Sequence, residues 1–216
     1  MKAISVIIAS VFLSAACHTA PVKNLTPTNM TTDNKNLDTA TFGQGCFWCA
    51  EAIFQQLKGI ESITSGFSGG HIKNPSYREV CMGTTGHAEV IQVVYDTTQV
   101  SYTDLLYAFF DSHDPTSLNK QGADEGTQYR SVIFYHNAKQ KEEAENIKAA
   151  LDKAGLYKKP IVTEISPFTA FYKAEDYHQD YYNENGSAPY CTYVIKPKLE
   201  KFREVFQKTG KLKNGN

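Results

Sequence analysis

The chain has 216 residues, of which 41% are hydrophobic and 12% aromatic, and its formal net charge is -1 at pH 7. This length and composition suffice for the core of one sizeable domain, and a near-neutral charge without a long basic block excludes nucleic acid as an expected partner. A core of this size needs no disulfide framework, so the five cysteines, which are unevenly placed, indicate chemistry.

The first residues have the form of an export signal. A charged start at Lys2 precedes an apolar run over 3–13, too short to span a membrane, and small residues lead to Cys17. We expect a signal peptide over 1–16. A cysteine after such an exit resembles a bacterial lipobox and favours lipid attachment at Cys17, although Ser14 stands where a lipobox usually has leucine. Plain secretion with cleavage near Ala16 is the alternative. Both interpretations place the protein outside the cytoplasm, in a bacterial envelope or periplasm, and lipid anchoring is the one we favour.

Residues 17–38 form a segment of different composition. From residue 20 onward threonine, asparagine, proline and lysine dominate, and large apolar residues are almost absent. We expect a flexible tether with a reach of about 25 Å. A single domain over 39–216 should follow.

The first half of this domain alternates strand and helix patterns. We predict a strand over 38–42, a glycine-bearing turn, and a helix over 50–58 with Ile53, Phe54 and Leu57 on one face. A strand over 60–67, a turn-rich loop over 73–78 and a strand over 87–96 follow. Ser101, with Asp104 three residues later, predicts a capped helix start.

The second half begins with a polar loop over 119–128 and a strand over 129–136. A helix over 138–154 ends at Gly155, and a strand over 161–166 and a short helix over 174–183 follow. The last predicted helix, 197–207, has its apolar residues on one side (Leu199, Phe202, Val205, Phe206). Two adjacent strands among alternating elements favour a two-layer α/β sandwich with a mixed sheet, and we expect a ferredoxin-like core.

The turn at 43–49, Gly-Gln-Gly-Cys-Phe-Trp-Cys, contains two of the five cysteines and the only tryptophan. A strand-to-helix turn here places Cys46 at a helix N-terminus. Free backbone N–H groups and the positive end of the helix dipole favour thiolate over thiol at such a position. We therefore predict that Cys46 is a nucleophile, and that burial in the core is the poorer interpretation of this cysteine.

Four motifs in order resemble the peptide-methionine (S)-S-oxide reductase family, type A. They are Gly45-Cys46-Phe47-Trp48, Gly86-His87-Ala88-Glu89, Gly126-Thr127-Gln128-Tyr129-Arg130-Ser131 and Glu175-Asp176-Tyr177-His178-Gln179. The resemblance runs in register from about residue 39 to 194. It implies reduction of methionine-(S)-sulfoxide, free or in proteins, by a thiol-dependent oxidoreductase that repairs oxidised proteins.

The resemblance assigns roles to individual positions. Cys46 attacks the sulfoxide sulfur and becomes a sulfenic acid, and Phe47 and Trp48 receive the substrate methyl group. Glu89 supplies the proton; its apolar strand setting independently predicts a raised pKa. Sequence alone favours a different interpretation of these residues. Phe47 and Trp48 would be ordinary core residues, and Glu89 would lie on the surface.

Three further positions match family residues. Tyr77 and Tyr129 correspond to the tyrosines that hydrogen-bond the sulfoxide oxygen, a role open to a neutral phenol. Asp124 corresponds to an aspartate that orients the site, although Ala123 stands where the family more often has asparagine. His178 and Asp180, on the tyrosine-rich short helix, are expected to support the site.

Two cysteines compete to resolve the sulfenic acid. Cys191 matches the recycling cysteine that the family carries near its C-terminus, and Cys49 forms a Cys-x-x-Cys pair with Cys46. The chain after Cys191 runs into a helix that could restrain it, and we favour Cys191 only slightly. The resulting disulfide would be reduced by a thioredoxin-like dithiol, with no cofactor and no metal. Cys81 is expected to be a bystander.

Two other functions would also use these cysteines. A thioredoxin-like oxidoreductase would explain Cys46 and Cys49 but not Glu89 or the loop over 126–131. A metal site would need Cys46, Cys49, Cys81 and Cys191 together, whereas zinc ligands usually come as two close pairs and only one exists here. We therefore predict a reductase, and expect it to be a monomer.

Overall fold

The structure, a computed structural model, describes residues 36–213, all within the compact unit Asn34–Asn216. Its first element is β1 (Leu37–Gln44), which begins two residues before the expected boundary between tether and domain. The predicted signal peptide, nearly all of the predicted tether and Cys17 lie outside the described residues.

The main sheet has six strands in the order β7-β6-β1-β3-β2-β8. Its bounds are β2 (Ile60–Ser68), β3 (Ala88–Asp96), β6 (Ser131–Tyr135), β7 (Glu164–Pro167) and β8 (Phe171–Lys173). Only the β6–β7 pair is parallel. The four central strands, with α1 (Phe47–Phe54) after β1 and α3 (Tyr102–Asp111) before β6, follow the ferredoxin-like order. The predicted mixed sheet is confirmed.

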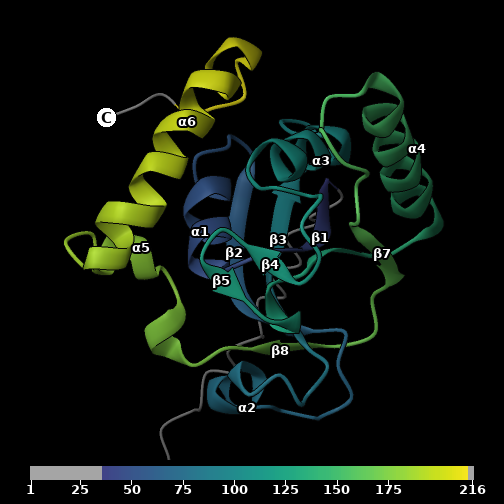
Figure 1. Cartoon of the computed structure of the whole chain (residues 1–216). Coiled ribbons are helices and arrows are strands. Elements are labelled where there is room, and N and C mark those ends of the chain that lie inside the picture. Colours follow the sequence, from purple (N-terminus) through teal and green to yellow (C-terminus); the bar gives the residue numbers. More distant parts are fainter. Residues whose placement is uncertain (1–35, 214–216) are drawn as a thin grey trace, which may run out of the picture. The chain divides into compact units, whose positions relative to one another are not determined.

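The main core lies between one face of the sheet and the helices. Alternation along β3 turns Ile91, Val93 and Tyr95 toward the core residues of α1 and α3, whereas Ala88 and Val90 join a smaller cluster on the other face. In Figure 1, α4 (Ala138–Ala154) lies beside α3, and α6 (Lys196–Phe206) lies beside α1. Glu89 belongs to the helix-facing set of β3 residues, and this places it at the start of α1.

Two predicted helices have the expected boundaries. Ser101 caps α3 in a capping box with Asp104, and α4 ends at Gly155 in the left-handed conformation, with φ of 64°. Ile53, Phe54 and Leu57 are fully buried as one apolar face, although Leu57 lies beyond the end of α1.

Other segments differ from the sequence prediction. The turn-rich loop contains a short helix, α2 (Tyr77–Cys81), which starts at a capping box formed by Ser76. The predicted helix over 174–183 is broken at Asp180, whose φ is 51°, into η2 (Asp176–His178) and α5 (Tyr181–Glu184). Within the polar loop, β4 (Lys120–Gln121) and β5 (Asp124–Glu125) form a hairpin.

The last helix differs from its prediction at one position. Leu199, Phe202 and Phe206 are buried, but Val205 is 48% exposed because it lies off the face that contacts α1. Among residues 36–213, no helix combines the length and the apolar character that a membrane crossing requires.

Candidate active site

The turn between β1 and α1 brings Cys46 to the start of the helix, as predicted. Gly45 has φ of 92°, and a Cβ at this position would lie 2.7 Å from the side chain of Gln121 in β4. Glycine is therefore required both by the backbone conformation and by the close approach of the hairpin. Cys46 is the N-cap residue of α1, and its carbonyl oxygen accepts from the Cys49 and Ala50 N–H groups.

Glu89 lies directly beside this helix start and is buried. The Phe47 N–H donates to Glu89 Oε2 at 3.1 Å, and Phe67 is paired with Glu89 across β2 and β3. Burial raises the pKa of Glu89 to about 8, although the Phe47 hydrogen bond opposes that rise. The raised pKa predicted from the sequence is confirmed. Glu89 Oε1 has no hydrogen-bond partner among the described residues, so a proton on it is free to be donated.

Cys46 differs from the expectation of a thiolate. Its burial raises its pKa well above the ordinary value, and the neighbouring Cys49 and Glu89 act in the same direction. The Phe47 N–H at the helix start, which could have stabilised a thiolate, is taken by Glu89. Desolvation therefore outweighs the helix N-terminus, and Cys46 is a thiol in this structure.

Cys49 lies one helical turn from Cys46, and its pKa is shifted in the opposite direction. A hydrogen bond from Cys46, together with the charge of Lys198, lowers the pKa of Cys49 to about 7, although burial acts against this. Lys198 Nζ lies 3.7 Å from Cys49 Sγ, and the Tyr190 hydroxyl lies 3.9 Å from the same sulfur. Of the two thiols in the turn, Cys49 is thus the one that ionises near neutral pH.

Cys191 is fully buried at the start of η3 (Cys191–Ile195), a π-helical turn that continues into α6. Burial raises its pKa, and the charge of Cys49 raises it further. Cys191 is therefore a neighbour of Cys49, held in regular structure as the sequence after it suggested.

The aromatic residues beside Cys46 form a connected group. Phe47 is buried against the rings of Phe67, Tyr77 and His178. Trp48 is only partly buried; it stacks on Tyr181, with ring centres 3.7 Å apart, and donates from Nε1 to His178 Nδ1 at 3.2 Å. His178 thus supports both aromatic side chains.

Asp180 holds the neighbouring segment in place. Its carboxylate accepts hydrogen bonds from Gln55 at the end of α1 and from Asn183. These contacts fix the break between η2 and α5, which positions the ring that stacks on Trp48.

Tyr77 and Tyr129 are half-buried, and burial raises the pKa of both phenols, with the charge of Glu89 adding to the effect. Both are neutral donors at physiological pH. Asp124, in β5, accepts a hydrogen bond of 2.8 Å from the Tyr190 hydroxyl. The hairpin is thereby joined to the segment that carries Cys191.

Two further motif residues hold the surrounding loops together. His87 Nδ1 accepts a hydrogen bond from the Gly70 N–H, and His87 Nε2 is hydrogen-bonded to the Ile72 carbonyl oxygen. Arg130 donates to the carbonyl oxygens of Thr127 and Gly86. These contacts connect the segment before Glu89 to the loop that follows β2 and to the turn that contains Tyr129, and they give His87 and Arg130 a structural role.

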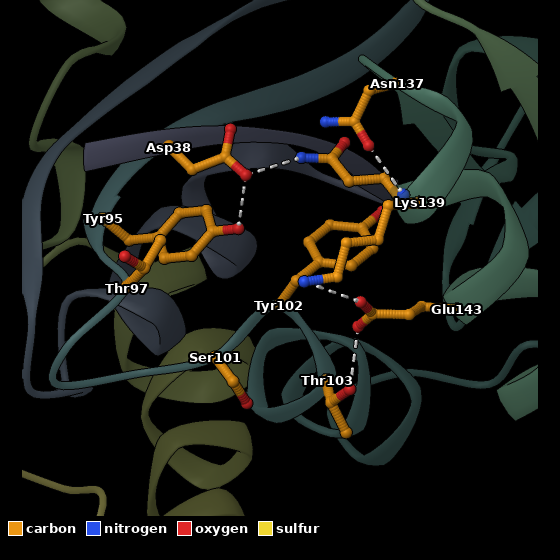
Figure 2. A pocket seen from close by; sticks show the side chains of 10 residues that line it. Asp38, Tyr95, Thr97, Ser101, Tyr102, Thr103, Asn137, Lys139 and Glu143 are labelled. Atoms are coloured by element: carbon orange, nitrogen blue, oxygen red, sulfur yellow. Dashed lines mark hydrogen bonds and ion pairs between the residues drawn. The ribbon is translucent and has the colours of Figure 1, made fainter. Parts of the chain in front are cut away.

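Cys81, exposed at the end of α2, neighbours the Tyr77 hydroxyl, which opposes the rise that burial causes in the pKa of the Cys81 thiol. Within residues 36–213, no cluster of three or more histidine, cysteine or acidic side chains could hold a metal ion. Figure 2 shows side chains that line a cavity, among them Asp38, Tyr95, Tyr102 and Glu143. The volume of this cavity is about 350 Å³. No cysteine lines this cavity, so it does not belong to the site around Cys46.

Sequence reasoning missed two residues of the site, Tyr190 and Lys198. One tyrosine among thirteen carries no distinguishing signal. Lys198 lies on the polar side of an amphipathic helix, where lysine is ordinary. Only the packing of α6 against α1 brings it to Cys49.

Comparisons with known proteins support the same assignment. The family model described as "Peptide methionine sulfoxide reductase" matches residues 38–210. Peptide methionine sulfoxide reductase MsrA of Saccharolobus solfataricus is 49% identical over 179 residues, covering 83% of this chain and all of the relative. The reduced form of Mxr1 from Saccharomyces cerevisiae has a TM-score of 0.68 and 34% identity over 73% of this chain and 91% of that chain.

A second yeast structure, Mxr1 in complex with Trx2, has a TM-score of 0.50 and 25% identity, and covers 71% of this chain and 91% of that chain. The family match takes in the whole sheet except Leu37, and each described residue to which a role was assigned. The chain belongs to the peptide methionine sulfoxide reductase family, type A.

Proposed function

We propose that this protein reduces methionine-(S)-sulfoxide, free or in proteins, to methionine, with Cys46 as the nucleophile and Glu89 as the proton donor. The observation that carries the proposal is a buried, neutral carboxyl beside a cysteine at a helix start. A sulfoxide oxygen leaves sulfur only if it is protonated, so the reaction needs such an acid at neutral pH.

The first step transfers oxygen from one sulfur to the other. Cys46 Sγ bonds to the sulfoxide sulfur as Glu89 protonates the sulfoxide oxygen. The new S–S bond and the substrate S–O bond then break as the hydroxyl passes to Cys46 Sγ, which becomes a sulfenic acid, and methionine leaves. Cys46 is oxidised by two electrons and the substrate sulfur is reduced by two. The proton lost by the Cys46 thiol restores the Glu89 carboxyl.

The surrounding side chains supply binding. The aromatic group of Phe47 and Trp48 gives the substrate methyl an apolar surface of the kind that thioethers favour. Tyr77 and Tyr129 are neutral, and the charge of an ionised Glu89 raises the pKa of both. Both hydroxyls would donate to the sulfoxide oxygen. Asp124 would orient the site through Tyr190.

We assign resolution of the Cys46 sulfenic acid to Cys49, and Cys191 is the alternative resolving cysteine. Cys49 is hydrogen-bonded to Cys46 and ionises near neutral pH, whereas Cys191 is a buried thiol whose pKa is raised by burial and by the charge of Cys49. A thioredoxin-like dithiol would then reduce the disulfide. The solved complex of Mxr1 with Trx2 supports this class of reductant.

The location proposed is outside the cytoplasm, with lipid attached to Cys17. The support is the apolar run over 3–13 and the small residues that precede the cysteine. Labelling cells with a radioactive fatty acid tests it. The wild-type protein should carry label in the membrane fraction, and Cys17→Ala should carry none. An unlabelled wild-type protein would contradict lipid attachment.

An assay with the separated epimers of a methyl sulfoxide tests the activity. With dithiothreitol as reductant, the wild-type protein should reduce the S epimer and leave the R epimer. Cys46→Ser should lose this activity. A Cys46→Ser protein with full activity would overturn the proposal.

A further inference from the structure

The Cys49 sulfur lies among several polar groups, and only one of them is a cation. They are Cys46, Glu89, Tyr190 and Asp124, together with Cys191 and Lys198 from the last part of the chain. Cys46 and Glu89 are neutral at pH 7 because burial raises the pKa of each. Asp124 is the one carboxylate of this set that opposes a negative charge on Cys49.

The neighbouring Tyr190 hydroxyl stabilises a Cys49 thiolate less than Lys198 does. Tyr190 has one proton, and it is donated to Asp124 at 2.8 Å, whereas the Tyr190 oxygen is 3.9 Å from Cys49 Sγ. Lys198 Nζ is closer, at 3.7 Å, and carries a full charge. Among residues 36–213, no acidic side chain forms an ion pair with Lys198. Its charge is therefore available to the sulfur.

The shape of the chain explains how the lysine reaches the thiol. The π-helical turn η3 passes directly into α6, which packs on α1, and Leu199 next to Lys198 is buried in the core. Lys198 itself is half-buried. Partial removal from water strengthens its attraction for a neighbouring anion.

We propose that Lys198 is a positioning residue for the second half of the reaction, which holds Cys49 as a thiolate so that it attacks the Cys46 sulfenic acid. This inference rests on the proposed function. In the attack, Cys49 Sγ bonds to Cys46 Sγ, and the bond from Cys46 Sγ to oxygen breaks. The departing hydroxide takes up the proton that Cys49 had given to solvent, and water forms.

The expected effect depends on pH. At pH 7 a thiol with a pKa of about 7 is half ionised. A thiol with the ordinary pKa of about 8.5 would be roughly fifteen times less ionised. The thiolate of higher pKa is about fivefold more nucleophilic, which offsets part of this. Loss of the whole lowering of the Cys49 pKa would slow disulfide formation at most about threefold at pH 7 and about sixfold at pH 6. The two rates would cross at about pH 8, and at pH 9 the protein with the ordinary pKa would be up to about fourfold faster.

The test compares Lys198→Met, which keeps the length of the side chain, with Lys198→Arg, which keeps the charge. Lys201→Met, on an exposed position of the same helix, is the control. Each full-length reduced protein is mixed with one equivalent of a methyl (S)-sulfoxide and quenched between pH 6 and 9. Methionine release and the disulfide-linked peptides are followed by mass spectrometry.

We expect methionine release at the wild-type rate in all three variants. Formation of the Cys46–Cys49 disulfide should shift to higher pH in Lys198→Met only, slower than the wild type below about pH 8 and no slower above it. A loss of structure would slow the reaction at every pH, so such a result contradicts the inference, as does an unshifted profile. A wild-type Cys46–Cys191 disulfide would also overturn it. Absence of methionine release from the wild type would instead overturn the proposed function.

Discussion

Burial decides the protonation of the residues around Cys46. Glu89 and Cys46 are both 7% exposed or less, and the pKa of each is raised because its ionised form is poorly solvated. The sequence predicted this for Glu89 from its apolar strand. It did not predict it for Cys46, because the helix start was visible in the sequence while the use of the Phe47 N–H by Glu89 depends on sheet register.

Glu89→Gln should slow methionine formation in a single turnover by about 10²–10⁴-fold, because the amide cannot deliver a proton. The amide oxygen can still accept from the Phe47 N–H, so the variant should fold. In the wild type, the rate should fall as pH rises through about 8, where Glu89 loses its proton. Glu143→Gln, at the cavity remote from the cysteines, is the matched control and should react normally. An equal rate for Glu89→Gln and the wild type would remove Glu89 from the mechanism.

The same carboxyl should make stability depend on pH. In the unfolded chain, Glu89 ionises above about pH 4.3. In the folded protein, it stays protonated up to about pH 8. The folded state therefore binds the extra proton, and stability falls as pH rises between these values, by up to about 1.4 kcal/mol per pH unit relative to Glu89→Gln.

Urea unfolding of both proteins from pH 5.5 to 8.5 measures this difference in the free energy of unfolding. The free energy of unfolding of the wild type should fall relative to that of Glu89→Gln with each increase in pH. A difference that stays constant with pH would show that Glu89 has an ordinary pKa.

Among the elements, the turn from β1 into α1 depends on the β4–β5 hairpin that covers it. Gln121 packs on Gly45, and its side chain also bonds both the N–H and the carbonyl oxygen of Asp114. The sequence predicted the turn but not the hairpin, because strands of two residues carry no periodic pattern.

Gly45→Ala should therefore destabilise the protein more than Gly155→Ala. Both positions have positive φ, which costs alanine about 1–2 kcal/mol. A Cβ at Gly155 meets nothing within 4 Å, whereas at Gly45 it would lie 2.7 Å from Gln121. The added clash should bring the total for Gly45→Ala to about 2–4 kcal/mol in urea unfolding. Equal losses at the two positions would contradict the close packing of the hairpin.

The success of the sequence prediction varied with element length. The long helix α4 was predicted with both boundaries, since its cap residues and terminal glycine are local signals. The tyrosine-rich segment was not, because the left-handed conformation of Asp180 is held by contacts to Gln55, more than a hundred residues away. Tertiary contacts of that kind leave no local pattern.

At the scale of the whole molecule, the site is assembled from distant parts of the chain. Cys46 and Cys49 come from the first helix, Glu89 from β3, Asp124 from the hairpin, and Lys198 from α6. The sequence assigned Cys46, Cys49, Glu89 and Asp124 to one site through the family resemblance, although it did not predict the hairpin that carries Asp124. The contribution of α6 depends on how the last helix packs on the first, and only the structure provides that.

The described unit should act without the residues that precede it. The family match starts at residue 38, and every residue assigned a chemical role in sulfoxide reduction lies after it. A protein that begins at Asn34 should therefore fold and reduce a methyl (S)-sulfoxide with the kcat/KM of the full-length chain. A large loss of kcat/KM on truncation would show that the first residues contribute to the site.

The proposed mechanism requires that Cys46 Sγ accept the substrate oxygen. The Cys49→Ser, Cys191→Ser double variant, which has neither candidate resolving thiol, should stop at the sulfenic acid after one equivalent of a methyl (S)-sulfoxide. Trapping with dimedone and peptide mass spectrometry should find the adduct on Cys46, with one methionine formed per protein. An adduct on Cys81, or methionine formed without any adduct on Cys46, would contradict the account.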